Sequence, residues 1–491
     1  MNINIIRYIL GLVLKIEAGL LLLPAIVGMF YREDTFSAYL IVATLTFIVG
    51  SIVSMAKPKN TVFHLKEGCI ATALSWILLS LVGAIPFVIT KEIPSFVDAF
   101  FETVSGFTTT GASILSDVES ISHASLFWRS FTHWVGGMGV LVFLLAIMPL
   151  SGGSNINLMK AESPGPSVGK LVPKVRSSAT ILYQIYFGMT LIQFVLLLIF
   201  KMPVFDAMCL TFGTAGTGGF GVRNDSIASY SVYQQWIIGI FMMLFGINFN
   251  FYYFFLRKKM RKAFAIEEVR WYLLFIIGAT LGIFLQLGGM VSGFEHKLRV
   301  AFFQVVSMIT TTGYSTADFN VWLPNAQLIL LLLMFSGACA GSTGGGFKVS
   351  RIVILLKAFV REIKSYIHPK SVGQIRMDKS PLPEGVVKST MVYLATYILI
   401  FIVSHFLITL DGKDFLTSFS AVTATFNNIG PGLSEVGPMS NYASLSAFSK
   451  LVLSFDMLAG RLELFPMLLL ITPAMWKNTH KQSKHDLVSL F

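Results

Sequence analysis

Residues 96–113 read FVDAFFETVSGFTTTGAS, an amphipathic run that ends in three threonines and a glycine before a short tail. The run is too short to cross a bilayer, which takes about 20 apolar residues, but segments of that length lie on both sides of it. A run of this kind occurs four times, about a hundred residues apart. The glycines that end the four copies are Gly111, Gly219, Gly313 and Gly430.

The four copies keep one register when residues are counted back from each glycine. Thirteen residues before the glycine a three-residue group begins, and in every copy it contains a small residue followed by a bulky apolar one. The groups are Asp98-Ala99-Phe100, Asp206-Ala207-Met208, Val300-Ala301-Phe302 and Thr417-Ser418-Phe419. Chance similarity between Phe-rich segments is the alternative, but the shared register and flanking helices favour four copies of one structural unit.

The composition is typical of a polytopic membrane protein. Of the 491 residues, 54% are hydrophobic and 13% are charged, and the mean hydropathy is +0.72. A soluble domain could not cover so much apolar surface. The cysteines Cys69, Cys209 and Cys339 are far apart and show neither disulfide nor metal spacing, so we interpret them as small buried residues.

The net charge of +12 does not indicate nucleic-acid binding, because the basic residues lie in alternate connections between apolar segments. By the positive-inside rule this alternation places both termini in the cytoplasm. The first apolar segment carries Lys15 and Glu17 and lacks a small-residue cleavage site, so we expect it to be retained as a helix. The basic stretches are 57–66, 160–176, 257–262, 351–388 and 477–484.

The remaining apolar segments arrange themselves around the four short runs. Two spanning helices are expected first, at about 5–30 and 38–56. Each unit then consists of an outer helix, a half-helix ending at the glycine, and an inner helix. The outer helices are expected at about 69–90, 178–201, 270–290 and 388–410, and the inner ones at about 128–150, 233–256, 325–359 and 447–475.

The predicted fold is an all-α polytopic membrane protein with four pseudo-fourfold helix–pore-loop–helix repeats around one pore, plus two extra N-terminal transmembrane helices. We expect ten spanning helices and four re-entrant half-helices, in contact with the lipid bilayer. The predicted segments are 1–60 for the N-terminal helix pair, then 61–155, 156–260, 261–370 and 371–491 for the four repeats, the last including a cytoplasmic tail.

We expect the four glycine-ending tips to form a cation filter. Non-helical backbone at membrane depth survives only where protein buries it or water reaches it. Glycine permits positive φ, which can turn successive carbonyls the same way, and rings of four carbonyls can replace a cation's hydration shell. The alternative is four ordinary helix C-caps. The candidate filter residues are Thr109, Thr110, Gly111, Thr217, Gly218, Gly219, Thr311, Thr312, Gly313, Asn428, Ile429 and Gly430.

The inner segment of the third unit contains a glycine-rich break, SGACAGSTGGGFK at residues 336–348. Each glycine costs a helix about 1 kcal/mol, so we expect a mobile loop below the filter that acts as a gate. A glycine-rich packing bend is the alternative, and a phosphate-binding loop is disfavoured because no strand precedes it. The candidate gate residues are Gly341, Ser342, Thr343, Gly344, Gly345, Gly346 and Lys348, with Arg461 from the last inner helix.

Charges inside apolar segments are costly and indicate functional sites by default. We expect Arg461 to project toward the pore axis, where it would impede cations or hold the loop through its carbonyls. The alternative is a structural pair with Glu463 or Asp456. For Glu102 and His133 we favour structural hydrogen bonds.

These motifs together resemble the Trk/Ktr/HKT superfamily of potassium transporters over nearly the whole chain. TTTGAS, TAGTGGFG, TTTGYST and NNIGPGLSEVGP look like its four filter signatures, and STGGGFK looks like its intramembrane loop. The two additional N-terminal helices resemble the bacterial TrkH branch more than KtrB. The second and fourth tips depart from TTTG, so the filter would not be fourfold in its chemistry.

The resemblance implies a K+ uptake protein of the bacterial inner membrane that forms a homodimer with one pore per protomer. K+ would bind at the filter positions as the transported ion, with no organic cofactor, and a cytoplasmic nucleotide-binding TrkA-type partner would control the gate. One alternative is an H+- or Na+-coupled K+ symporter, although four units of one orientation favour a pore. A membrane-embedded enzyme using Glu102, His133 or Asp456 is the other, but we expect no enzymatic activity because no catalytic set stands out.

Overall fold

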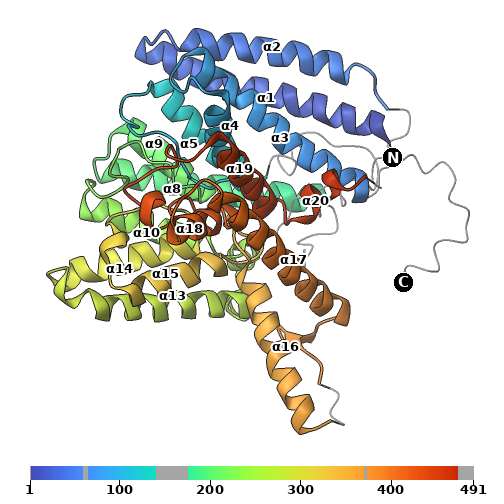
Figure 1. Cartoon of the computed structure of the whole chain (residues 1–491), viewed down its shortest axis with the longest axis vertical. Helices are drawn as coiled ribbons and strands as arrows, with labels where there is room; N and C mark the ends of the chain where they lie inside the picture. Colours follow the sequence, from blue (N-terminus) through green and yellow to red (C-terminus); the bar gives the residue numbers. More distant parts are fainter. Residues whose placement is uncertain (1, 59–64, 140–174, 370–372, 474–491) are drawn as a thin grey trace, which may run out of the picture.

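The computed structural model describes residues 2–58, 65–139, 175–369 and 373–473, and these are largely helical. Helices α1 (Ile3–Tyr31) and α2 (Phe36–Ser54) lie side by side along one edge of the molecule (Figure 1). Gly11 permits their close approach, because a Cβ there would lie less than 3.0 Å from the backbone of Ser54. The expected N-terminal helix pair is therefore present.

Four outer helices are long enough to cross a bilayer. With α1 and α2 they make six helices, among the described residues, whose length and composition suit a membrane span. The outer helices are α3 (Leu65–Ile89), α8 (Val175–Ile199), α13 (Glu267–Gln286) and α17 (Glu384–Thr409).

Four shorter helices follow the outer ones and end at the predicted tips. At about 1.5 Å per residue, a helix of this length covers only part of the bilayer, as expected for re-entrant half-helices. Side-chain caps start two of them: Ser95 accepts from the Asp98 N–H, and Asp414 accepts from the Thr417 N–H. These pore helices are α4 (Phe96–Phe107), α9 (Val204–Gly216), α14 (Phe294–Ile309) and α18 (Phe415–Phe426).

The inner segments differ from the prediction, because three of them are broken and not only the third. The expected continuous helices at 233–256 and 447–475 are wrong. The first of these two bends by 93° between α10 and α11, where Asn248 caps the new helix by accepting from the Asn250 N–H. The second breaks where Glu463 and Leu464 adopt left-handed φ of 62° and 63°. The inner elements are α5 (His123–Gly137), α10 (Val232–Phe245), α11 (Phe249–Leu256), α15 (Pro324–Ser336), α16 (Val349–Ile367), α19 (Ala447–Arg461) and α20 (Phe465–Ile471).

The helices close into a ring of four units. Each inner helix packs between its own pore helix and the next one along: α5 contacts α4 and α9, α10 contacts α9 and α14, α15 contacts α14 and α18, and α19 contacts α18 and α4. The last unit therefore meets the first. This arrangement is the predicted pseudo-fourfold fold.

Helix α12 (Met260–Phe264) and a short hairpin lie at the end of the molecule that carries the basic connections. There, α12 precedes α13, and the hairpin of β1 (Arg376–Met377) and β2 (Ser380–Pro381) lies between α16 and α17. Figure 1 shows α16 projecting away from the bundle. Short 3-10 turns η1 (Leu287–Gly289), η2 (Phe319–Val321) and η3 (Ser434–Val436) complete the connections.

Several sequence predictions lie outside the described residues. They include the end of the inner helix expected at 128–150 and most of the basic stretches at 160–176 and 477–484. Three of the four predicted segment boundaries, after 60, 155 and 370, also fall there, and the fourth falls at the start of α12. The segment boundaries remain predictions.

Candidate ion pathway

All four pore helices end in the same backbone turn. The residue two positions before each glycine is left-handed, with φ of 56° at Thr109, 55° at Thr217, 58° at Thr311 and 57° at Asn428. The next N–H donates to the carbonyl five residues back, over 2.7 to 2.9 Å in the four helices. This is a Schellman C-cap, so the cap residue is the threonine or asparagine and the glycine has a separate role.

The glycines themselves also have positive φ, of 79°, 84°, 82° and 96° in chain order. The residue between cap and glycine is not among those with positive φ, so backbone handedness alternates over three residues in every tip. Such alternation turns successive carbonyls toward one side, and it is strained for residues other than glycine. The common backbone is what a ring of carbonyl oxygens requires.

Each glycine packs against the backbone of a neighbouring tip. A Cβ added at any of the four would lie less than 3.0 Å from the carbonyl oxygen of the residue before another tip's glycine. The pairs are Gly111 with Gly218, Gly219 with Thr312, Gly313 with Ile429, and Gly430 with Thr110. The four tips therefore form a closed ring, in the same order around the axis as the four units of helices.

The carbonyls of this ring have no hydrogen-bond donor among the described residues. They belong to Thr110, Gly218, Thr312 and Ile429, which are all buried. A buried peptide carbonyl without a partner costs about 1–3 kcal/mol, so four of them together need a compensating ligand. A partly dehydrated cation is such a ligand.

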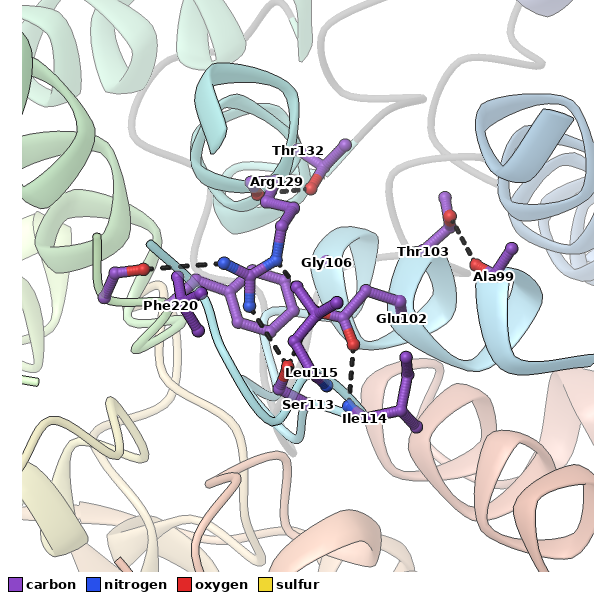
Figure 2. Close-up of polar contacts among 12 residues, drawn as sticks. Ala99, Glu102, Thr103, Gly106, Ser113, Ile114, Leu115, Arg129, Thr132 and Phe220 are labelled. Carbon is purple, nitrogen blue, oxygen red and sulfur yellow. Dashed lines mark hydrogen bonds and ion pairs between the residues drawn. The ribbon is translucent and has the colours of Figure 1, made fainter. Parts of the chain in front are cut away.

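A buried ion pair fastens the first tip to its pore helix and to the second tip (Figure 2). Arg129 of α5 lies 2.8 Å from Glu102 of α4, and their side chains are 2% and 0% exposed. Glu102 also accepts from the hydroxyl of Ser113 and the N–H of Ile114, both at 2.9 Å. The Arg129 guanidinium lies over the ring of Phe220, 4.0 Å from its centroid. Arg129 therefore links its own helix α5 to the pore helix α4 and to Phe220 beside the second tip.

The third and fourth tips are fastened by neutral groups, which bind the residue three positions beyond each glycine. With its amide oriented to suit its donors, the oxygen of Gln304 accepts from the Thr316 N–H at 2.9 Å. The Ser420 hydroxyl accepts from the Leu433 N–H, also at 2.9 Å. Thr316 and Leu433 are three residues beyond their glycines, as Ile114 is in the first tip.

The second tip is held by its neighbours. The Phe220 N–H donates to Nε2 of His133 at 3.2 Å, and the Tyr314 hydroxyl of the third tip lies 3.3 Å from the Phe220 carbonyl. The other ring nitrogen of His133 is 2.8 Å from the Gly106 carbonyl. The structural hydrogen bonds expected for Glu102 and His133 are thus present.

A hollow of about 130 Å³ lies against the four glycines. It is on the side of the ring toward which the chain continues after each tip. Arg129 and Arg223 are its charged lining residues, and the Tyr442 hydroxyl in its wall donates to the Gly430 carbonyl at 2.6 Å. Residues before the glycines face the opposite side. The tips therefore separate this hollow from the glycine-rich loop.

The glycine-rich loop lies directly against that opposite side. Helix α15 ends at Ser336 and α16 begins at Val349, so the predicted break is present. The Gly345 N–H donates to the Thr311 hydroxyl at 2.6 Å, and a Cβ on Gly345 would lie 2.7 Å from the Asn427 carbonyl oxygen. The loop thus contacts the ends of the third and fourth pore helices.

Glu268, near the start of α13, holds both ends of the loop. Its carboxylate accepts from the Ala340 N–H at 2.6 Å and from the Ser350 N–H at 3.0 Å. It also accepts from the Asn248 amide at 3.4 Å, at the bend between α10 and α11. Glu268 is 3% exposed, so these bonds form away from competing water.

Arg461 bridges the loop to the opposite side of the ring. Its guanidinium donates to the Thr343 carbonyl at 2.8 Å and to the carbonyls of Gly136 and Gly137 at 2.6 and 2.8 Å. The loop of the third unit, the arginine of the fourth and the inner helix of the first are therefore linked below the filter. Lys348, 1% exposed, donates to the Gly344 carbonyl within the loop.

The alternative partners of Arg461 are engaged elsewhere. Glu463 forms an ion pair with Arg351, and Asp456 accepts from the Ser404 hydroxyl at 2.6 Å. Asp456 therefore binds α17, whereas Glu102 and His133 bind the first two tips. Among the described residues no group of three or more His, Cys, Asp and Glu side chains could hold a metal ion. The arrangement gives no support to a membrane-embedded enzyme.

Two residues of this pathway, Arg129 and Glu268, were not predicted from the sequence. Arg129 lies in a segment interpreted only as an inner helix, and Glu268 lies just after a basic connection, where a charge is unremarkable. Arg129 could have been predicted, because a carboxylate such as Glu102 in a buried half-helix needs a cationic partner, and Arg129 lies in the inner helix of the same unit. For Glu268 no local pattern pointed to a loop more than seventy residues away.

Comparison with known proteins gives a consistent result. A family model, TrkH, described as a cation transport protein, matches residues 37–478. The chain is 36% identical to the Trk system potassium uptake protein TrkH of Salmonella typhimurium and 35% identical to that of Escherichia coli K12, covering 97% of this chain and 100% of each relative. The crystal structure of the potassium transporter TrkH from Vibrio parahaemolyticus matches with a TM-score of 0.87 and 31% identity, over 97% of this chain and all of that chain.

Proposed function

The chain belongs to the TrkH family of cation transport proteins, and we propose that it takes up K+ across a membrane through the ring of tips. It is a membrane protein of a transporter family and not an enzyme. The relatives named above are potassium uptake proteins, which supports K+ as the transported ion.

One observation carries the proposal: four buried backbone carbonyls, in a closed ring, without donors among the described residues. A K+ ion binds a small number of carbonyl oxygens in place of its hydration water. The twelve tip residues carry no charge, which favours passage of a monovalent ion over tight binding of a divalent one. The filter is therefore formed by the backbone of residues 109–111, 217–219, 311–313 and 428–430.

The glycine-rich loop is proposed to be the gate. Its contacts with Thr311 and Asn427 place it against the loop-facing side of the filter, and Glu268 and Arg461 hold it there. Opening requires these hydrogen bonds to release or move together. The guanidinium of Arg461, which donates to the loop, would oppose cations while the loop is in place.

The protein is proposed to act in the bacterial inner membrane with both termini in the cytoplasm, as the basic connections at one end support. The relatives are named as parts of a Trk system, which supports partner subunits. We propose a homodimer and a cytoplasmic nucleotide-binding TrkA-type subunit that acts on the gate.

The direct test is growth of a K+-uptake-deficient bacterium at low K+, with this chain expressed alone and with a nucleotide-binding partner. We expect rescue in at least one of the two strains. Absence of rescue despite verified membrane insertion in both would contradict K+ uptake. Proteoliposome flux then addresses coupling: a pore conducts K+ down its own gradient, whereas a symporter requires an H+ or Na+ gradient.

Arg129 offers a separate prediction about the filter's support. Arg129→Met should leave Glu102 buried without its cation, which costs about 3–5 kcal/mol. We expect a lower thermal unfolding midpoint and weaker discrimination of K+ from Na+ in liposome flux. The control is Arg223→Met, since that pair is 3.5 Å apart with an arginine 37% exposed, and such pairs contribute about 0–1 kcal/mol. Equal effects of the two substitutions would contradict the role of Arg129 in supporting the filter.

A further inference from the structure

A hollow of about 480 Å³ lies at the basic end of the molecule, between α13, α16 and residues 373–376. Its size is within the range of ligand sites, about 300–1,000 Å³. Four of its lining side chains are cationic. They are Lys357, Arg361 and Lys364 of α16 and Arg376 of β1.

Two of these cations are already paired and two are not. Lys357 lies 2.5 Å from Glu267, and Arg361 lies 2.5 Å from Glu384. No acidic side chain of the described residues lies within ion-pair distance of Lys364 or Arg376. The hollow therefore has positive charge available for an anion.

Apolar side chains also line the hollow, and those of α16 alternate with its basic residues. Trp271 of α13 and the α16 residues Val353, Leu356 and Val360 line it. Leu356 and Val360 remain 45% and 47% exposed. Trp271 lies four residues from the start of a helix that suits a membrane span, where tryptophan commonly marks the membrane interface. An occupant must combine an anionic group with an apolar chain.

We propose that this hollow binds an anionic glycerophospholipid of the cytoplasmic leaflet. The lipid phosphate lies between Lys364 and Arg376, and an acyl chain runs along Leu356 and Val360. Basic pockets on the cytoplasmic side of helix bundles suit such headgroups. A free phosphate would use the cations but would leave the apolar side chains of the lining uncovered, so the lipid is the occupant favoured here.

The test uses the purified full-length chain in neutral detergent and a fluorescent phosphatidylglycerol as the probe, with phosphatidylcholine of the same acyl chains for comparison. The variant is Lys364→Gln with Arg376→Gln, and the matched control is Lys259→Gln with Lys388→Gln, two basic residues that do not line the hollow. Wild type and control should bind phosphatidylglycerol about tenfold more tightly than phosphatidylcholine, and the variant should lose most of that preference.

Three outcomes would overturn the proposal. The first is a variant that keeps the preference for phosphatidylglycerol, and the second is an equal loss in the control. The third is full displacement of the lipid by millimolar inorganic phosphate, which would assign the hollow to a soluble anion. Monodisperse elution of the variant excludes misfolding as the cause. Binding is read without ion flux, so the result does not depend on the proposed transport function.

Discussion

Gly219→Ala is expected to lower K+ uptake sharply, whereas Gly188→Ala leaves uptake near that of the unmodified chain. At Gly219 the backbone has φ of 84°, and a Cβ would overlap the carbonyl oxygen of Thr312 in the next tip. A left-handed residue other than glycine costs about 1–3 kcal/mol, and overpacking costs about 1–3 kcal/mol more. The change also moves a carbonyl of the proposed filter.

Gly188 is a suitable control because it lies in the outer helix of the same unit and a Cβ there meets nothing within 4 Å. The measurement is K+ flux into liposomes that hold equal amounts of each variant. We expect at least a tenfold loss for Gly219→Ala, corresponding to about 1.4 kcal/mol. Normal flux and selectivity in a well-folded Gly219→Ala chain would contradict the filter assignment.

Most of the fold could be predicted because it repeats. Counting back from Gly111 and its three counterparts established four units, and hydropathy separated spanning helices from half-helices. The tips could be located for the same reason. Their backbone could not, since the sequence does not reveal that Thr109 and its counterparts are the cap residues and that the glycines face neighbouring carbonyls.

The breaks in the inner helices could not be predicted from the local hydropathy pattern. Residues 233–256 are mostly apolar and contain two glycines, Gly239 and Gly246, of which only Gly246 lies at the bend, and a helix tolerates isolated glycines. The bend is stabilised from elsewhere in the chain: the Gly246 carbonyl accepts from the Cys339 N–H at 3.1 Å, and the Phe249 N–H donates to the Gly341 carbonyl at 3.0 Å. Partners so distant in the sequence leave no periodic signal. The bend and the glycine-rich loop therefore form one structural unit.

That unit makes Glu268 the residue whose loss should most affect gating. Glu268→Gln removes the charge but keeps the volume. The donors of Ala340 and Ser350 share Oε1, so the single amide oxygen can keep both bonds only as a neutral acceptor, and the Asn248 amide, which donates to the other oxygen, loses its acceptor. Hydrogen bonds to a charged group contribute about 1.5–3 kcal/mol each. Neutral hydrogen bonds contribute only about 0.5–1.5 kcal/mol, so weakening the two loop bonds together would shift the gate equilibrium by about tenfold or more toward the open loop.

We therefore expect Glu268→Gln to raise K+ leak in the absence of any partner by at least about tenfold. The loop carries its own reporter, Cys339, which is fully buried. In a chain with Cys69→Ser and Cys209→Ser, a water-soluble thiol reagent should label Cys339 faster after Glu268→Gln than before. The control is Glu267→Gln, because the neighbouring carboxylate pairs with Lys357 and not with the loop.

The two readouts separate the gate from the filter. If Glu268→Gln exposes Cys339 without raising flux, the loop moves but does not control the ion path, and the gate assignment is wrong while the filter assignment stands. If neither readout changes relative to Glu267→Gln, Glu268 does not hold the loop. An increase in both, with K+ selectivity retained, is the result expected of a latch that releases the gate and leaves the ring of carbonyls intact.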